Sequence, residues 1–189
     1  MTKLLARWLM ASLLMSMSTL CLAQEPSRPE RKLDVWYVPT PEAIVDRMLL
    51  MAKVKPLDVV YDLGCGDGRI VIAAAKKYGT RGVGIDLDPA RIREARANAK
   101  AAGVEKLVRF EVADLFKTDL SEATVVTLYL LPEINRRLRP KLIAELRAGS
   151  RVVSHDFDMG KEWPPDEYVK LGNDGIYLWH IPPRQGNAP

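Results

Sequence analysis

A loop with three glycines is the part of this sequence best suited to hold a ligand. The stretch VVYDLGCGDGRI places glycine at every second position after an apolar run, at Gly64, Gly66 and Gly68. Glycine has no side chain and adopts positive φ readily, so such a loop brings backbone N–H groups against a ligand at the start of a helix. Asp62 stands just before the glycines, so the ligand must tolerate a carboxylate nearby.

The charges of this loop argue against a phosphate ligand. Asp62 and Asp67 both belong to it, and a carboxylate beside a pyrophosphate is repelled in a partly dry site. Arg69 stands where a dinucleotide fingerprint has its third glycine, and no lysine follows the glycines as in a P-loop. S-adenosylmethionine joins an ammonium and a sulfonium group to a nucleoside without any phosphate, and it is the ligand that this charge pattern favours.

Two further acids follow the next two predicted strands. Asp86 ends the second strand, where its carboxylate can accept hydrogen bonds from both hydroxyls of a ribose. Asp114 stands just past the third strand, in EVADLF, where it can reach the amino group of an adenine. Since the carboxyl ends of parallel strands meet at one edge of a sheet, these acids and the glycine loop are expected to form one site.

Strands and helices must alternate along the chain to bring these residues together. Apolar runs rich in β-branched residues predict strands at 59–63, 82–86, 108–114, 124–130 and 151–157, with short extended stretches at about 167–171 and 175–181. Helices are predicted after Thr40 as cap and Pro41 as first residue, at 68–78, from Pro89 to Gly103, and in separate stretches after Pro132 and Pro140. The alternation is typical of a doubly wound α/β fold. We expect a mostly parallel sheet with helices on both faces and an antiparallel edge.

The ordered set of motifs resembles a known enzyme family. Asp62-x-Gly64-x-Gly66-x-Gly68, Asp86 and the pair Ala113-Asp114 are similar to the motifs of class I, seven-stranded, S-adenosylmethionine-dependent methyltransferases, over about residues 35–180. The resemblance implies a Rossmann-like fold in which the glycine loop holds the methionine moiety of the cofactor. It also implies that the second-strand acid holds the ribose and that the third-strand acid contacts the adenine.

A narrower resemblance concerns the acceptor. YVPTP, DLGCGDGRI, VADLF, the Leu-Pro after the fourth strand and GSRVVSHDF with a following Trp are similar to seven-stranded protein-lysine methyltransferases, some of which have N-terminal membrane segments. The resemblance implies that Tyr37 and Thr40 line the methionine end of the cofactor site and that Tyr129 lies near the acceptor. We therefore expect N-methylation of a protein lysine. A methyltransferase of a small metabolite or lipid, and an exported non-catalytic domain that binds a nucleoside ligand, are the alternatives.

The residues around the expected acceptor pocket are less distinctive. The segment that begins at Tyr129 lacks the Asn/Asp-Pro-Pro-Tyr/Phe sequence with which enzymes that methylate base or glutamine nitrogens hold a planar amine or amide. Tyr129, Asp156 and Trp163 are candidates for an aromatic, acidic wall. His155, Asp156 and Asp158 have the residue types of a metal site, but their spacing is no zinc signature. We predict no metal there, because His155 and Asp156 point to opposite faces if the strand continues.

Residues 1–23 have the pattern of a signal peptide or a membrane anchor. Lys3 and Arg7 precede an uncharged stretch that ends in Cys21-Leu22-Ala23, with small residues at the positions of a cleavage site. The uncharged stretch is short for a membrane span, which needs about 20 residues, and a transit peptide stays open as a third interpretation. The chain is expected to be exported to the periplasm or anchored to a membrane, and the sequence does not decide on which side of the membrane the domain lies.

Composition limits the class of partner. Residues 24–34 are expected to form a linker, 35–182 the methyltransferase domain and 183–189 a C-terminal tail. Without Lys3 and Arg7, 26 basic residues stand against 24 acidic ones, so the net charge of +4 falls to +2. Such a mild excess, without a basic cluster on one face, predicts no nucleic-acid partner. With Cys21 in the leader, Cys65 has no partner for an intramolecular disulfide.

Overall fold

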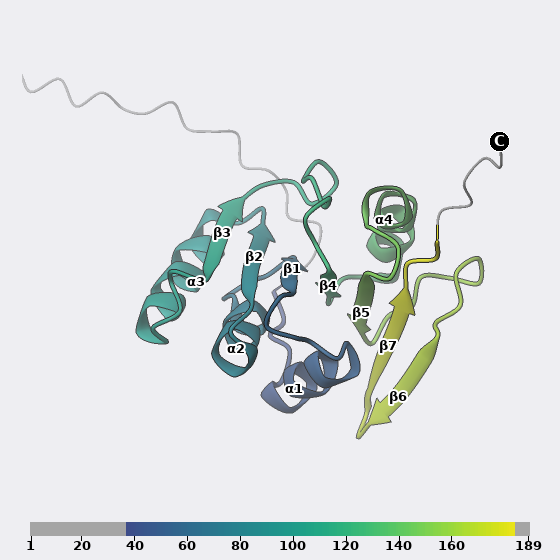
Figure 1. Cartoon of the computed structure of the whole chain (residues 1–189), viewed down its shortest axis with the longest axis horizontal. Coiled ribbons are helices and arrows are strands. Elements are labelled where there is room, and N and C mark those ends of the chain that lie inside the picture. The colour runs from purple at the N-terminus through teal and green to yellow at the C-terminus, as the bar shows by residue number, and fades with distance from the viewer. Residues whose placement is uncertain (1–36, 184–189) are drawn as a thin grey trace, which may run out of the picture. The chain divides into compact units, whose positions relative to one another are not determined.

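The apolar runs of the sequence form the strands expected of them. The computed structural model describes residues 37–183, and its seven strands lie within one or two residues of most predicted ranges (Figure 1). They are β1 (Val59–Leu63), β2 (Arg81–Asp86), β3 (Val108–Val112), β4 (Val125–Leu128), β5 (Arg151–His155), β6 (Glu167–Leu171) and β7 (Asp174–His180). Every residue of β1 and β4 is buried, as in a central parallel strand covered on both faces.

The strands form one sheet in the order β3-β2-β1-β4-β5-β7-β6. The pairings from β3 to β5 are parallel, while β7 pairs antiparallel with both β5 and β6. The prediction of a mostly parallel sheet with an antiparallel end is thus confirmed. The strand order reverses between β1 and β4, and ligands of doubly wound sheets bind outside the carboxyl ends of the strands at this point.

Helices cover both faces of the sheet. They are α1 (Glu42–Met51), α2 (Arg69–Tyr78), α3 (Pro89–Ala101) and α4 (Pro132–Glu145). Leu138 of α4 shares an apolar core with Leu63 of β1, whereas Met48 of α1 packs with Val60 of the same strand. Since residues at odd separation in a strand point to opposite faces, α4 covers one face and α1 the other. Figure 1 shows α2 and α3 on the side of α1.

The start of α1 differs from the prediction. The helix begins at Glu42 with Pro41 as its N-cap, and the prediction that Thr40 caps it is wrong. The carbonyl of Pro41 accepts the first helical hydrogen bonds, and Thr40 is buried with its own carbonyl bonded to Arg69. Apolar residues at helical spacing along α1 and its C-cap are buried: Ile44, Val45, Met48, Leu49 and Ala52.

One helix replaces the two stretches expected around Pro140. This proline lies inside α4, although a proline in a helix interior removes a hydrogen bond and costs about 3 kcal/mol. Leu138 and Leu142 flank it one turn apart, and both are fully buried in the same core. Burying a leucine contributes roughly 1.5–3 kcal/mol, so the two side chains offset the cost of the proline and keep the helix continuous.

The predictions for the two ends of the chain lie outside the described residues. These are the leader or anchor at 1–23, the linker at 24–34 and all but the first residue of the tail at 183–189. Within residues 37–183, no helix combines the length and the apolar character that crossing a membrane requires.

Candidate active site

The three glycines all have positive φ, which explains why this loop needs them. Gly64, Gly66 and Gly68 have φ values of 83°, 51° and 79°. A Cβ on Gly66 would lie 2.2 Å from Cε2 of Tyr37, so the loop lets an aromatic ring pack directly on its backbone. The same atom on Gly68 would lie 2.6 Å from Phe110. These two glycines therefore serve close packing within the protein.

The loop also orients the acid at the end of β2. The backbone N–H of Gly66 donates to Oδ2 of Asp86 at 2.9 Å, and the N–H of Asp88 donates to Oδ1 at 2.9 Å. Two backbone donors hold this carboxylate in one orientation beside the loop. Because each carboxylate oxygen has two lone pairs, Asp86 can accept further hydrogen bonds from a ligand.

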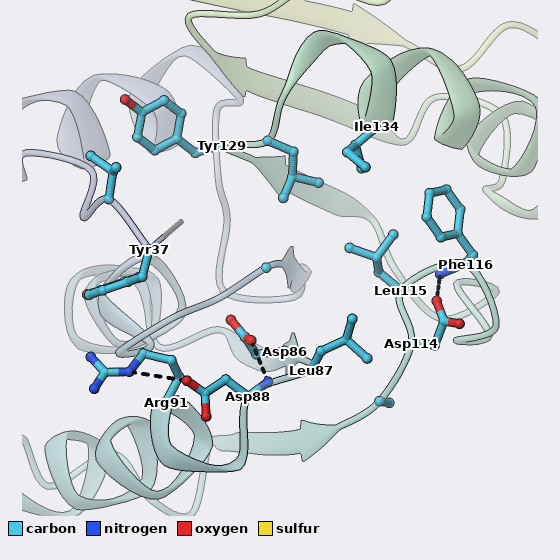
Figure 2. Close-up of a pocket in the computed structure, with 14 residues that line it drawn as sticks. Tyr37, Asp86, Leu87, Asp88, Arg91, Asp114, Leu115, Phe116, Tyr129 and Ile134 are labelled. Carbon is cyan, nitrogen blue, oxygen red and sulfur yellow. Dashed lines mark hydrogen bonds and ion pairs between the residues drawn. The ribbon is translucent and has the colours of Figure 1, made fainter. Parts of the chain in front are cut away.

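A cavity opens at the carboxyl end of the sheet. Its lining comes from the segment before α1, the glycine loop and the segments after β2, β3 and β4: Tyr37, Val38, Gly64, Asp86, Leu87, Asp88, Arg91, Ala113, Asp114, Leu115, Phe116, Tyr129, Leu130 and Ile134. Figure 2 shows Tyr37 and Tyr129 toward one side of the drawn residues and Asp114 and Phe116 toward the other. Asp86 lies between these two groups, so the cavity has an aromatic end and an end that contains Asp114.

Of the predicted site residues, five line this cavity and four do not. Tyr37, Gly64, Asp86, Asp114 and Tyr129 are brought together from separate parts of the chain. Gly66 and Gly68 are covered by aromatic rings, as described above. Thr40 and Asp62 are each 3% exposed and do not line the cavity.

Asp62 is a buried acid with one strong partner. Its Oδ1 accepts a hydrogen bond of 2.7 Å from the hydroxyl of Thr127 on the neighbouring strand β4. Burial raises the pKa of this carboxyl group, the nearby carboxylates of Asp86 and Asp67 add to the rise and the Thr127 bond opposes it; together they bring the pKa from 3.8 to about 7. Asp62 therefore binds a proton close to neutral pH.

Sequence reasoning missed the arginine that ties the loop to α1. Arg69 pairs with both oxygens of Asp67, through Nε at 3.0 Å and Nη2 at 2.6 Å, and its Nη1 donates to the carbonyl of Thr40 at 2.9 Å. The guanidinium of Arg69 holds the pKa of Asp67 below its usual range, although burial acts in the opposite direction. The position of Arg69, one residue after the last glycine, was the available signal.

Arg91 and Asp88 are further residues of the cavity that the sequence did not reveal. Asp88 caps α3, with Oδ1 accepting from the N–H of Ala90 at 2.7 Å, and it also lines the cavity. Arg91 lies over the ring of Tyr37, 4.9 Å from its centroid. The lining thus carries the three carboxylates of Asp86, Asp88 and Asp114 against one guanidinium. A cation suits this balance better than an anion.

The aromatic end of the cavity continues onto β5. The ring of Tyr129 stacks on His155, with ring centroids 3.9 Å apart. His155 and Asp156 lie together, with Nε2 and Oδ2 3.6 Å apart. Opposite faces were expected only if the strand continued past His155, and it does not. The strand ends at His155, and Asp156 takes a φ of 62°, which turns its side chain back. Trp163, the third residue proposed for the acceptor wall, instead packs on Trp179.

Comparison with known proteins identifies the family. The model of the ANTKMT methyltransferase domain matches residues 62–167, from the acid before the glycines to the first residue of β6. The chain belongs to the ANTKMT methyltransferase domain family. Its reaction is methyl transfer from S-adenosylmethionine, as the motifs predicted, and the alternative of a non-catalytic domain is not supported.

Relatives from two other organisms support this assignment. A protein-lysine N-methyltransferase of Saccharolobus islandicus is 49% identical over 150 residues, which cover 77% of this chain and 92% of that protein. An adenine nucleotide translocase lysine N-methyltransferase of Mus musculus is 35% identical over 158 residues, covering 84% of this chain and 67% of that protein. The chain therefore spans about two thirds of the length of the Mus musculus relative.

A solved structure is also similar. A protein of Salinibacter ruber, described as an RNA methyltransferase in complex with S-adenosyl-L-homocysteine, is 58% identical and superposes with a TM-score of 0.76. The match covers 80% of this chain and 97% of the Salinibacter chain. S-adenosyl-L-homocysteine is what remains of S-adenosylmethionine after methyl transfer.

The described residues fit this cofactor. The cavity offers carboxylate acceptors at Asp86 and Asp114 and a net negative lining, which suits a ligand with ammonium, sulfonium and ribose hydroxyl groups. One oxygen of Asp114 accepts from the N–H of Phe116 at 3.0 Å, which fixes the carboxylate and leaves its other oxygen for a ligand donor. At Gly64, whose φ of 83° favours glycine, a Cβ would lie 2.7 Å from Cδ2 of Leu130 in the cavity wall.

Proposed function

We propose that the chain transfers a methyl group from S-adenosylmethionine to the side-chain nitrogen of a protein lysine. The observation that carries this proposal is the cavity that Asp86 and Asp114 line together with Tyr37 and Tyr129. The 49% identical relative from Saccharolobus islandicus, named as a protein-lysine N-methyltransferase, supports the lysine acceptor.

Each cofactor group has a proposed partner. Asp86 accepts from the ribose hydroxyls, and Asp114 accepts from the adenine amino group. The backbone of the loop at Gly64, which lines the cavity, contacts the methionine moiety, and Tyr37 covers that moiety from the segment before α1. Gly66 and Gly68 shape the loop by packing against Tyr37 and Phe110. Asp62 and Thr40 act indirectly, since both are buried and do not line the cavity.

The chemistry asks the protein for alignment and exclusion of water. When bound, the cofactor supplies an electrophilic methyl whose bond to sulfur breaks as the amine lone pair forms a new bond to carbon, and the nitrogen gives up one proton to solvent. Tyr129, which lies at the aromatic end of the cavity, is proposed to hold the acceptor amine in line with that methyl. Leu130 and Ile134, which also line the cavity, keep it poor in water.

The surface charges favour a protein over a nucleic acid. Most basic groups of α4 already have partners: Arg136, Arg139 and Lys141 pair with acids at 3.1, 2.7 and 2.6 Å, and Arg137 lies over the ring of Phe116. A nucleic-acid site needs several basic side chains that can neutralise phosphates. The Salinibacter relative described as an RNA methyltransferase makes RNA the rival acceptor to be tested.

The N-terminal segment stays a proposal about location. We propose that residues 1–23 direct the chain to a membrane or across it, on the basis of the sequence pattern alone. A tag fused to the C-terminus and probed with protease in intact cells separates the two sides of the membrane.

The function is tested by giving the full chain labelled S-adenosylmethionine and an extract of the source cell. The label is then divided into protease-sensitive, ribonuclease-sensitive, lipid and small-molecule fractions, and lysine is identified by mass spectrometry. We expect protease-sensitive label on lysine that disappears with Asp86→Ala and persists with Asp119→Ala, which removes an exposed acid outside the cavity. Label that only ribonuclease releases, or that stays with lipids or small molecules, would refute lysine as the acceptor and leave the assignment of the cofactor site unchanged.

A further inference from the structure

A buried histidine supports the tyrosine at the aromatic end of the cavity. The side chain of His155 is 1% exposed, and its ring stacks on Tyr129 with centroids 3.9 Å apart and planes at 32°. Phe157 extends the same aromatic wall, with its ring stacked 6.4 Å from that of Tyr129. Tyr129 is therefore held from a neighbouring strand and the turn that follows it.

Two carboxylates surround this histidine. Nε2 of His155 lies 3.0 Å from Oδ1 of Asp174 and 3.6 Å from Oδ2 of Asp156. A carboxylate only accepts hydrogen bonds, so Nε2 carries a proton. Nδ1 is buried and has no hydrogen-bond partner among the described residues, a state that is rare for a buried polar atom.

The backbone is arranged to bring Asp156 to this cluster. Its φ of 62° is left-handed, a conformation that costs a residue with a side chain about 1–2 kcal/mol. Two hydrogen bonds to Gly175 on β7 maintain it: the N–H of Asp156 donates to the Gly175 carbonyl at 2.7 Å, and Oδ1 accepts from the Gly175 N–H at 2.9 Å. Backbone strain that neighbouring bonds maintain is a common feature of functional sites.

The cluster has a negative charge that no lysine or arginine balances. Within residues 37–183, the ion pairs of Asp156 and Asp174 are those with His155. Two carboxylates and at most one positive charge on the imidazole leave a net charge of −1 or −2. Both side chains are about a third exposed, so a charged group can approach them. Burial raises the pKa of Tyr129, and the carboxylates of Asp156 and Asp174 raise it further, so their field reaches the cavity wall.

We propose that Asp156 and Asp174, held around His155 beside Tyr129, bind the positively charged side chain of the acceptor before methyl transfer. Carboxylates and aromatic faces both attract an ammonium group. His155 is a positioning residue, since it holds Asp174 by a hydrogen bond and Tyr129 by stacking. This inference rests on the proposed function, because it takes the acceptor to be a lysine.

The cluster acts on acceptor binding more than on the chemical step. A negative field stabilises the ammonium form of lysine, whereas attack on the methyl requires the neutral amine. Loss of one carboxylate is therefore expected to raise the KM for the acceptor and to leave kcat nearly unchanged. The affinity for the cofactor is expected to stay the same, because neither carboxylate lines the cavity described above.

The test uses the full chain and a peptide of glycine and alanine whose central residue is lysine, trimethyllysine or norleucine, of which the first two are cationic and norleucine is neutral. The lysine peptide reports KM and kcat with labelled S-adenosylmethionine. The trimethyllysine and norleucine peptides report binding by fluorescence anisotropy in the presence of S-adenosylhomocysteine. We expect the wild-type chain to prefer trimethyllysine over norleucine. Asp156→Asn and Asp174→Asn should each reduce that preference and raise KM about fivefold.

Asp158→Asn is the matched control, because Asp158 is exposed, lies two residues from Asp156 and forms its hydrogen bond with Gly160. Equal effects of all three variants would overturn the inference about the cluster but not the proposed function. Equal binding of the trimethyllysine and norleucine peptides by a wild-type chain that methylates lysine would do the same. Binding of Zn²⁺ or Mn²⁺ that Asp174→Asn abolishes would also overturn it, since the cluster would then serve a metal. Preference for the cationic peptide without lysine labelling in the extract would instead refute the proposed function and leave the cation site.

Discussion

Replacing Asp62 with asparagine should change how the stability of the protein depends on pH. Asp62 is 3% exposed, and burial raises its pKa from 3.8 to about 7. Asp62→Asn keeps the size of the side chain and an oxygen that can accept the hydrogen bond from the hydroxyl of Thr127. The substitution therefore removes the ionisation and little else, so it isolates the effect of burying this one charge.

The magnitude follows from the two pKa values. Because the folded chain holds a proton that the unfolded chain has already released above pH 3.8, the contribution of Asp62 to stability is fully present below that pH. It is lost as pH rises toward 7. Each pKa unit between the folded and unfolded chains is worth about 1.4 kcal/mol, so the wild-type chain should lose about 4 kcal/mol over this interval relative to Asp62→Asn.

Urea unfolding of the full chain without cofactor, followed by tryptophan fluorescence between about pH 3.5 and 8, measures this difference. Comparing the two chains at each pH cancels the contributions of all other titrating groups. Asp46→Asn, which removes an exposed carboxylate paired with Lys77 at 3.0 Å, is the control and should run nearly parallel to wild type. If the free-energy curves of wild type and Asp62→Asn are parallel within about 1 kcal/mol, burial does not oppose the ionisation of Asp62 and the reasoning is wrong.

Two further predictions concern the glycine loop. Gly66→Ala places a Cβ 2.2 Å from Tyr37 at a φ of 51°, so it should cost about 1–2 kcal/mol in urea unfolding and weaken the binding of S-adenosylhomocysteine in calorimetry. Unchanged affinity would show that Tyr37 can move without loss to the site. Arg69→Gln removes the two-bond pair with Asp67, which is partly exposed, and should cost about 1 kcal/mol by the same unfolding assay. An equal loss in Arg69→Lys is expected, since a lysine cannot form the planar pair.

The strands, and the acids that follow successive strands, could be predicted from the sequence because both are local patterns. Apolar, β-branched runs predicted the first five strands, short extended stretches indicated the last two, and the pairing of glycines with an acid at the next strand end located Asp86. Physical chemistry links these positions directly: parallel strands end at one edge, and positive φ there requires glycine. The helix boundaries were less accessible, since at Pro140 the burial of leucines in tertiary contacts outweighs a local preference.

The tertiary structure alone decided which side chains face the cavity. Arg91 and Asp88 line it because α3 starts beside Asp86, and Arg91 also covers Tyr37 from a segment distant in the chain. The cluster of His155, Asp156 and Asp174 depends on where β5 ends and on a backbone turn held by β7. An alternating pattern placed the first two on opposite faces, because a sequence does not show where a strand stops.

The sequence by itself thus determined the cofactor class, through the spacing of glycines and carboxylates along successive strands. That information is local, since each residue needs only its own strand end. The acceptor end of the site brings together residues 129, 155 and 174, which meet only because β4, β5 and β7 are neighbours in the sheet. Contacts between distant strands depend on the packing of the whole domain, and the tertiary structure was needed to reveal them.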